Sequence, residues 1–238
     1  MPLLEVNGIV KSYGGIQALR TCTFTVEPGT VTGLIGPNGS GKTTMFNVIT
    51  GYEKPDGGAV QYQGTVISGK SPLDVFALGI GRTFQAPRTF ARLSLVENLK
   101  IPVINTASED SRAKSTEWAL SWLEFVGLER HSGALAGSLS YGQRKLLEFA
   151  MVAAAEPAMM LLDEPAGGVN PAMIETMARL ITEMNGRGVA FLVVEHNMGF
   201  VMNLCHHVVV MHHGQVIASG EPAMIQQNPV VVDAYLGD

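Results

Sequence analysis

A glycine-rich segment followed by lysine and threonine is the feature of this sequence with the clearest chemical meaning. It runs Gly36-Pro37-Asn38-Gly39-Ser40-Gly41-Lys42-Thr43 and matches G-x-x-x-x-G-K-[ST] between an apolar strand pattern (VTGLIG) and a helical pattern (KTTMFNVIT). In that setting glycines let backbone N–H groups point at an anion, and the helix N-terminus adds positive potential. Lys42 would reach the β- and γ-phosphates, and Thr43 would bind Mg²⁺. A glycine turn that binds nothing would not explain the lysine and threonine, so we predict a nucleoside triphosphate site.

Two adjacent carboxylates follow a second apolar run, MMLLDEP. Asp163 and Glu164 would lie at the carboxyl end of a buried strand, the edge where open α/β sheets bind ligands. Asp163 would then serve the Mg²⁺ shell, and Glu164 would polarise the attacking water. The alternative is that both are solvated turn residues before Pro165.

Three further side chains have a predicted role only in combination with the phosphate loop and the carboxylate pair. His196 follows the apolar run FLVVE and could contact the γ-phosphate or orient Glu164, although a buried structural histidine is the ordinary alternative. Gln85, in GRTFQAP, carries an amide oxygen that could reach Mg²⁺. Tyr13, in KSYGG, could stack on a base or be a half-buried core tyrosine.

The pattern of elements predicts one α/β domain. Residues 3–6 and 21–26 look like antiparallel strands, 57–68 return to that sheet, and 72–79 suggest a short helix. From residue 86 to 157 the periodicity is mainly helical, after which apolar strands and a Met-rich helix alternate. We therefore expect a single domain, 1–238, whose core (1–85 and 158–238) carries an inserted helical lobe (86–157).

Composition limits the function classes. The 238 residues are 46% apolar, and 16 basic against 21 acidic side chains give a formal net charge of −5. That balance offers no general attraction to polyanions, so we expect no nucleic-acid partner. Cys22 and Cys205 lack metal or redox spacing and look like small core residues. With no export signal and no run of about 18 apolar residues, the chain is expected to be neither exported nor membrane-spanning.

The segment LSYGQ, Leu139 to Gln143, resembles the signature motif of ATP-binding-cassette (ABC) proteins and lies between the phosphate loop and the carboxylate pair, as in that family. The resemblance spans almost the whole chain. It implies a P-loop NTPase core with a mainly parallel sheet, an N-terminal antiparallel β subdomain and an inserted α-helical signature lobe. It also implies the following site residues: catalytic Glu164, His196 and Lys42; nucleotide-binding Tyr13, Gly36, Asn38, Gly39, Ser40, Gly41, Lys42, Thr43 and Thr44; and magnesium-binding Thr43, Gln85 and Asp163.

The signature implies a second subunit. Ser140 and Gly142 would open a helix whose exposed N–H groups need an anion, and in the family Ser140, Gly142 and Gln143 serve the γ-phosphate held by the opposite subunit. Asn170, in AGGVNP, would lie in the dimer-contact loop. The competing interpretation is an ordinary helix capped by Ser140.

Four segments, GIGRTFQAPRTFARLSLVENL, LSYGQRKLLEFA, DEPAGGVNP and NPVVVDAYLGD, resemble ATPase subunits of importers for branched-chain and other hydrophobic amino acids. This resemblance implies a second ABC ATPase subunit, identical or different, and transmembrane permease subunits as partners. The chain would be cytoplasmic and peripheral on the inner face of the cell membrane, with membrane contact only through those partners.

Three alternatives stay open. One is a soluble ABC ATPase acting on nucleic acid or ribosomes, for which a coiled-coil insertion or basic surface would be expected. The second is an importer of another small solute such as urea, and the third a P-loop kinase or GTPase, against which the signature argues. The pairs His206-His207 and His212-His213 flank VVVM, and we expect neighbours there to point to opposite faces of a strand instead of sharing a metal.

Overall fold

Two β-sheets form the framework of the chain in the computed structural model, which describes residues 1–103 and 115–236. One sheet is antiparallel with strand order β2-β1-β4-β5, and the other has the order β10-β9-β3-β8-β7-β6. Their bounds are β1 Leu4–Tyr13, β2 Ile16–Val26, β3 Val31–Ile35, β4 Gly57–Tyr62, β5 Thr65–Val66, β6 Ile80–Arg82, β7 Met159–Asp163, β8 Ala190–Val194, β9 His207–His212 and β10 Gln215–Gly220.

The antiparallel sheet contains the strands predicted near the N-terminus, but both are longer than predicted. β1 and β2 form a hairpin whose ends pair Leu4 with Val26 and Tyr13 with Ile16. Gly14, with φ of 57°, supplies the left-handed backbone that so tight a connection requires. Polar residues within both strands had obscured their length.

The second sheet is parallel except for β10, which pairs antiparallel with β9. Strands β3, β7 and β8 are buried along their entire length, which explains their continuous apolar sequences. Because the strands are parallel, the segments that follow β3, β6, β7 and β8 all leave the sheet at one edge. The phosphate loop, Gln85, Glu164 and His196 lie in those four segments.

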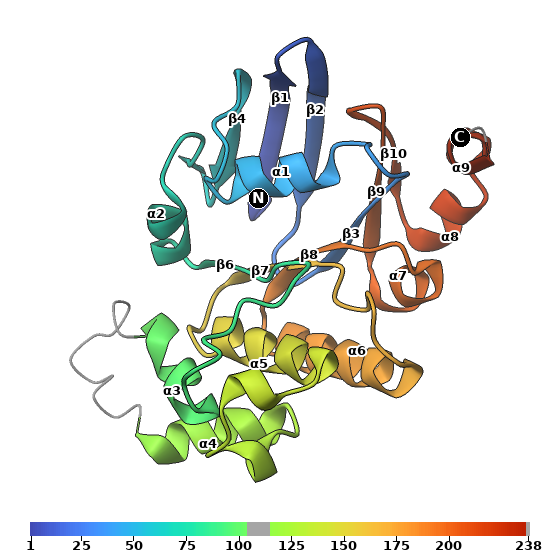
Figure 1. Cartoon of the computed structure of the whole chain (residues 1–238). Helices are drawn as coiled ribbons and strands as arrows, with labels where there is room; N and C mark the ends of the chain where they lie inside the picture. The colour runs from blue at the N-terminus through green and yellow to red at the C-terminus, as the bar shows by residue number, and fades with distance from the viewer. Residues whose placement is uncertain (104–114, 237–238) are drawn as a thin grey trace.

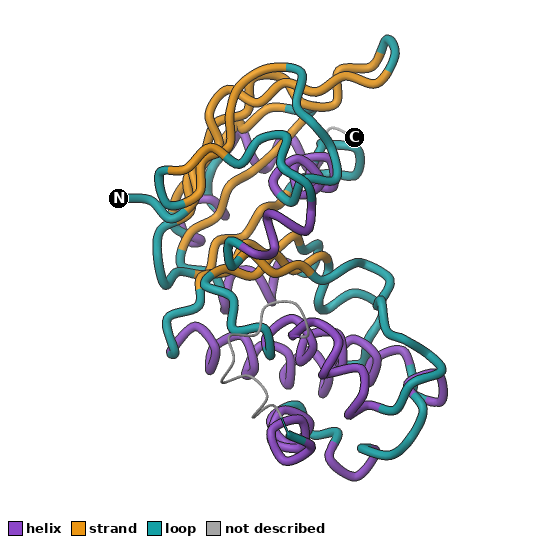
Figure 2. Tube along the Cα trace, turned by 90° about the vertical axis from the view of Figure 1, so that its left-hand side faces the viewer, coloured by secondary structure: helices purple, strands orange, loops and turns teal. Residues whose placement is uncertain are grey.

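Helices cover both faces of the parallel sheet (Figures 1 and 2). Helix α1 lies between the two sheets, whereas α5 and α6 pack on the opposite face. The helix bounds are α1 Lys42–Ile49, α2 Pro72–Ala77, α3 Leu95–Lys100, α4 Thr116–Phe125, α5 Tyr141–Ala153, α6 Pro171–Gly186, α7 Met198–Leu204, α8 Pro222–Gln226 and α9 Pro229–Leu236, with 3₁₀ turns at Ile101–Val103, Glu129–His131 and Ala136–Ser138.

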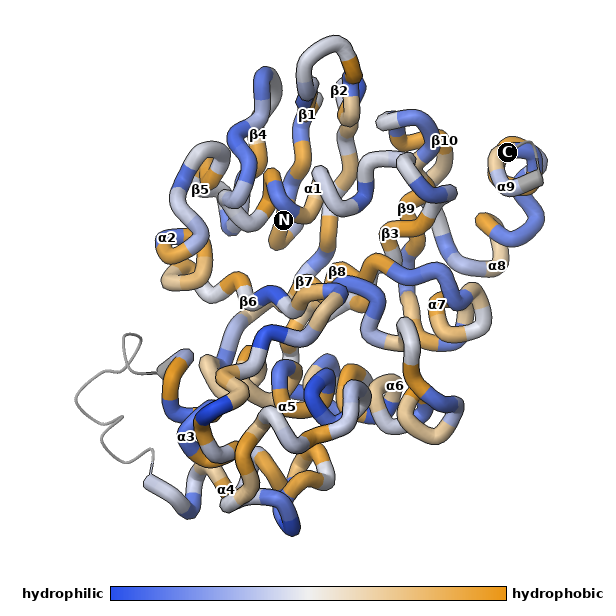
Figure 3. Tube along the Cα trace, in the orientation of Figure 1, coloured by the Kyte–Doolittle hydropathy of each residue, from blue (hydrophilic) through white to orange (hydrophobic). Residues whose placement is uncertain are grey.

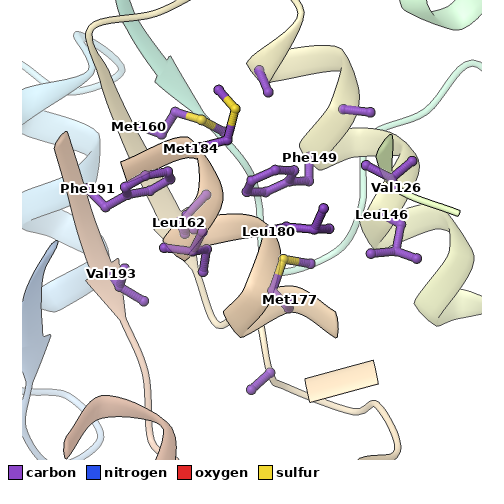
Figure 4. Close-up of a cluster of buried hydrophobic side chains, with 14 of the residues drawn as sticks. Val126, Leu146, Phe149, Met160, Leu162, Met177, Leu180, Met184, Phe191 and Val193 are labelled. Atoms are coloured by element: carbon purple, nitrogen blue, oxygen red, sulfur yellow. The ribbon is translucent and has the colours of Figure 1, made fainter. Parts of the chain in front are cut away.

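The helical lobe is joined to the sheet through a continuous apolar core. Figure 4 shows its centre, where α5, α6, β7 and β8 contribute Leu146, Phe149, Met160, Leu162, Met177, Leu180, Met184, Phe191 and Val193. Full burial of one such side chain contributes about 1.5–3 kcal/mol relative to exposure. Strands β8 and β9 are correspondingly hydrophobic in Figure 3. The lobe is therefore packed directly against β7 and β8, the strands that lead to Glu164 and His196.

Helix starts in the lobe are fixed by local hydrogen bonds. Ser94 with Glu97, and Ser140 with Gln143, form capping boxes that open α3 and α5.

Among residues 1–103 and 115–236, none of the helices combines the length and hydropathy that a membrane crossing requires.

One expectation about the histidines is wrong. β9 ends at His212, and His213 has a left-handed φ of 45°, so the two rings do not point to opposite faces. Their centroids lie 3.9 Å apart. The strand pattern fails here because a turn begins one residue earlier than the sequence pattern suggested. Cys22 and Cys205 are buried free thiols, as predicted.

Candidate active site

The phosphate loop connects β3 to α1 in a conformation that only glycine tolerates at two of its positions. Gly36 has φ of 148°, and a Cβ there would lie 2.0 Å from the carbonyl oxygen of Met211. At Gly41 (φ 103°) a Cβ would lie 2.7 Å from the carbonyl oxygen of Ala18. Gly41 is also the N-cap of α1 and makes no side-chain cap, so no capping side chain satisfies the first N–H groups of α1, and they are available to an anion.

Lys42 is held inside this loop. Its side-chain nitrogen donates to the carbonyl oxygens of Gly36 and Pro37, each at 2.8 Å, and to Ser40 Oγ at 3.2 Å. Burial lowers the pKa of Lys42, and the carboxylates of Glu164 and Asp163 oppose that shift. The ammonium group is thus fixed at the centre of the loop, close to the carboxylate pair.

Glu164 is held from both sides. Gln85 Nε2 donates to its Oε2 at 2.9 Å, and His196 Nε2 lies 3.2 Å from its Oε1. Its backbone is in the left-handed region, with φ of 49°, and its N–H donates to the carbonyl of Val194. Non-glycine residues in this region commonly mark functional sites. Gln85, Glu164 and His196, which separate sequence patterns suggested, are therefore in contact at the Glu164 carboxylate.

These side chains surround an open hollow of ≈ 310 Å³, at the lower end of the range for small-molecule sites. Its lining joins the phosphate loop to the three strand ends: Ala18, Asn38, Gly39, Gly41, Lys42, Thr43, Thr44, Gln85, Glu164, Val194 and His196. Gly36 and Ser40 also belong to the phosphate loop, but both are buried and do not line the hollow.

Asp163 lies just outside the hollow. It is 7% exposed, and Arg82 approaches it with 3.5 Å between Nη2 and Oδ2. Burial raises the pKa of Asp163, while Arg82 acts in the opposite direction. Arg82 also donates to Asn47 Oδ1 and Thr50 Oγ1, at 2.8 and 2.9 Å, which links β6 to α1. No sequence pattern indicated the role of Arg82.

Tyr13 lies at the end of β1 and is 43% exposed. Its hydroxyl interacts with Thr44 and Glu53, and burial raises its pKa. Lys11 Nζ lies 5.3 Å from the ring centroid. Tyr13 is therefore a half-exposed aromatic near Thr44 of α1, and its base-stacking role stays a prediction.

The signature residues lie away from the hollow. Ser140 Oγ accepts from the N–H of Gln143 at 3.3 Å, and Gln143 Oε1 accepts from the N–H of Ser140 at 3.0 Å. Ser140 is exposed, and neither it nor Gly142 nor Gln143 lines the hollow of its own chain. The capping role that competed with the signature interpretation is therefore present in the structure.

Sequence reasoning missed a buried carboxylate next to His196. Glu195 is 2% exposed; its Oε1 accepts from the N–H of Ala166 at 2.6 Å, and its Oε2 accepts from the N–H groups of His196 and Asn197. It ties the segment after Glu164 to the segment that carries His196. The available signal was a charged residue at the end of the apolar run FLVVEH.

A glycine loop around a lysine, a carboxylate fixed beside it and helices on both faces of a parallel sheet define a P-loop nucleotide-binding protein. Residues 19–167 match the family described as ABC transporter, and residues 215–238 match that described as branched-chain amino acid ATP-binding cassette transporter. The chain belongs to the ABC transporter family.

Relatives cover the whole chain. The high-affinity branched-chain amino acid transport ATP-binding protein BraF of Pseudomonas aeruginosa is 38% identical, spanning 100% of this chain and 98% of its own length. LivG of Escherichia coli K12, with the same description, is 35% identical over the same shares. A nucleotide-free ATP-binding cassette of an ABC transporter superimposes with a TM-score of 0.89 at 36% identity and full coverage of both chains. The ADP conformation of the cassette MJ1267 gives the same three values. The predicted fold class is thereby confirmed.

Proposed function

We propose that this chain is the ATP-hydrolysing subunit of a membrane importer and that it cleaves ATP in the hollow beside the phosphate loop. The observation that supports this most directly is the position of Glu164. Gln85 and His196 fix both of its oxygens at the edge of a hollow that Lys42 and Thr43 also line. A carboxylate so placed can accept a proton from water attacking a γ-phosphate, while His196 keeps it oriented.

The phosphate loop would supply most of the binding. Lys42 would exchange its contacts with the loop oxygens for the β- and γ-phosphates, and the N–H groups from Asn38 to Thr44 would surround the phosphate chain. Tyr13 would stack on the adenine.

Thr43, Gln85 and Asp163 would hold Mg²⁺. Hydroxyl, amide and carboxylate oxygens together with phosphates suit this cation, which rarely takes an all-protein cage. Gln85 directs its nitrogen to Glu164, so its amide oxygen is the atom offered to the metal. Held by these residues, Mg²⁺ would neutralise negative charge on the phosphates during hydrolysis.

A second ABC ATPase subunit would complete the site. The exposed N-terminus of α5 offers Ser140 and Gly142 to an anion outside its own hollow. A partner's γ-phosphate meets that description, and the partner's signature would in turn cover this chain's nucleotide. Such a pair is an identical or a different cassette.

The cargo would be branched-chain or other hydrophobic amino acids. The relatives' names and the match of residues 215–238 support this assignment. The chain would work on the cytoplasmic face of the membrane and reach the membrane only through permease subunits.

The test is to express the chain with any permease, second ATPase and solute-receptor genes found in neighbouring reading frames, and to reconstitute the resulting complex in liposomes. We expect leucine, isoleucine or valine to stimulate ATP hydrolysis and to accumulate on the opposite side. Stimulation by urea but not by these amino acids would reassign the cargo. Salt-sensitive RNA or DNA binding by a chain that does not associate with the permease would contradict the transport role.

A further inference from the structure

The first residue of the signature helix contacts the segment that carries Gln85. Tyr141 donates its phenolic hydrogen to the backbone carbonyl of Gln85, with 2.8 Å between the two oxygens. Its ring also lies against Gly168, where a Cβ would come within 3.3 Å of the ring. Gly168 lies four residues after Glu164. The Tyr141 side chain therefore contacts two segments: the one that carries Gln85, the hydrogen-bond partner of Glu164, and the one that follows Glu164 in sequence.

Two charged residues on the same face of α5 reach the same segments. Lys145 and Glu148 follow Tyr141 at four and seven residues, the spacing of one helical face. Lys145 Nζ donates to the backbone carbonyl of Glu164. Glu148 accepts from the N–H groups of Arg88 at 2.8 Å and Phe84 at 3.4 Å.

These contacts are costly to break. Lys145 and Glu148 are 5% and 4% exposed, and a buried charge that loses its hydrogen bonds has no water to replace them. Arg88 also stacks on Phe84, 3.7 Å from the ring centroid, which stiffens the segment between them. The backbone of residues 84–88 thus follows α5, whereas the exposed side chain of Gln85 is oriented by its bond to Glu164.

We propose that Tyr141 is a positioning residue for hydrolysis: with Lys145 and Glu148, it fixes Gln85 and Glu164 relative to α5. The Glu164 carboxylate is then aligned only while this helix is in place. A glycine at position 141 would lack the contact. The inference rests on the proposed function, and it makes the signature helix of one chain a support for that chain's own base as well as a ligand for its partner's nucleotide.

The first test is Tyr141→Phe, which removes one hydrogen bond and keeps the ring. A bond of this kind corresponds to about a five- to tenfold fall in kcat. We expect that fall with an unchanged KM for ATP and an unchanged unfolding midpoint. The matched control is Tyr62→Phe, because the buried Tyr62 hydroxyl has no hydrogen-bond partner in the described part of the chain. Its kcat should equal that of the unmodified chain.

The second test separates positioning from general packing. If Tyr141 acts through Gln85, then Tyr141→Phe added to Gln85→Ala should lower kcat no further. An equal loss in both backgrounds, or full activity of Tyr141→Phe, overturns the inference. Glu164→Gln, measured alongside, separates failure of the proposed function from failure of the positioning role. Full activity of Glu164→Gln would contradict the proposed function itself. An inactive Glu164→Gln together with a fully active Tyr141→Phe would reject only the positioning role of Tyr141.

Discussion

Gln85 and Glu164 are joined by a hydrogen bond of 2.9 Å between Nε2 and Oε2, although 79 residues separate them in sequence. The parallel sheet brings them together. β6 and β7 are neighbours whose register pairs Arg82 with Leu161, so both segments leave the sheet at the same edge. His196 follows β8, the next strand, and reaches the other carboxylate oxygen. The orientation of the carboxylate thus depends on three adjacent strand ends.

Glu164→Gln should abolish hydrolysis and keep ATP binding. The amide preserves shape but cannot accept a proton from water, and loss of a general base costs about 10²- to 10⁴-fold in rate. We expect kcat to fall within that range, nucleotide affinity to be retained, and a nucleotide-closed dimer to accumulate in size-exclusion chromatography with MgATP. Glu124→Gln, on the exposed face of α4, is the control. Near-normal turnover by Glu164→Gln would refute the assignment of the base.

Lys42→Ala should act on binding instead. The substitution removes the only charge inside the phosphate loop's ring of carbonyl oxygens, so affinity for ATP should fall by at least about tenfold, the loss of one charge-assisted contact. Titration with a fluorescent ATP analogue measures this directly. Lys70→Ala removes an exposed lysine and should leave affinity unchanged. Unaltered affinity in Lys42→Ala would mean that the nucleotide binds elsewhere.

The sequence predicted those parts of the site that lie in contiguous patterns. The phosphate loop, Asp163-Glu164 and the turn after FLVVE each follow an apolar run, so local spacing was enough to indicate them. Lys145, Glu148 and Glu195 were not predicted. They interrupt apolar patterns, and their partners are backbone groups in distant segments, which one-dimensional periodicity does not reveal. The roles assigned to individual site residues stay predictions.

Ser140→Arg should damage the nucleotide site of the partner subunit. Arginine at the start of α5 would place bulk and a longer side chain where a γ-phosphate must approach N–H groups. For two copies of this chain, we expect Ser140→Arg alone and Lys42→Ala alone to be inactive. Mixing them should restore hydrolysis, because the intact phosphate loop of one copy then meets the intact signature of the other. The absence of any recovery in mixtures shown to pair would reject the shared site.

Ionisation of Glu148 should make the free energy of unfolding depend on pH. Burial raises the pKa of Glu148 to about 7 from its ordinary value of 4.5, although the N–H groups of Arg88 and Phe84 and the charges of Lys145 and Arg88 favour its ionised form. Between those values the folded chain keeps a proton that the unfolded chain has released. Rising pH therefore favours unfolding through Glu148. Its ionisation does not change the free energy of unfolding below pH 4.5, and it lowers that free energy by about 3 kcal/mol above pH 7.

Glu148→Gln should remove this dependence. Relative to the unmodified chain, the free energy of unfolding of the variant should rise by about 2–3 kcal/mol between pH 5 and pH 8, as measured by urea denaturation. Glu97→Gln is the control of opposite sign. Hydrogen bonds from Ser94 lower the pKa of Glu97, so that group stabilises the fold at higher pH and the contribution is lost as pH falls. Its variant should lose relative stability as pH rises. Parallel curves for Glu148→Gln and the unmodified chain would mean that Glu148 ionises in the folded chain as it does in the unfolded one.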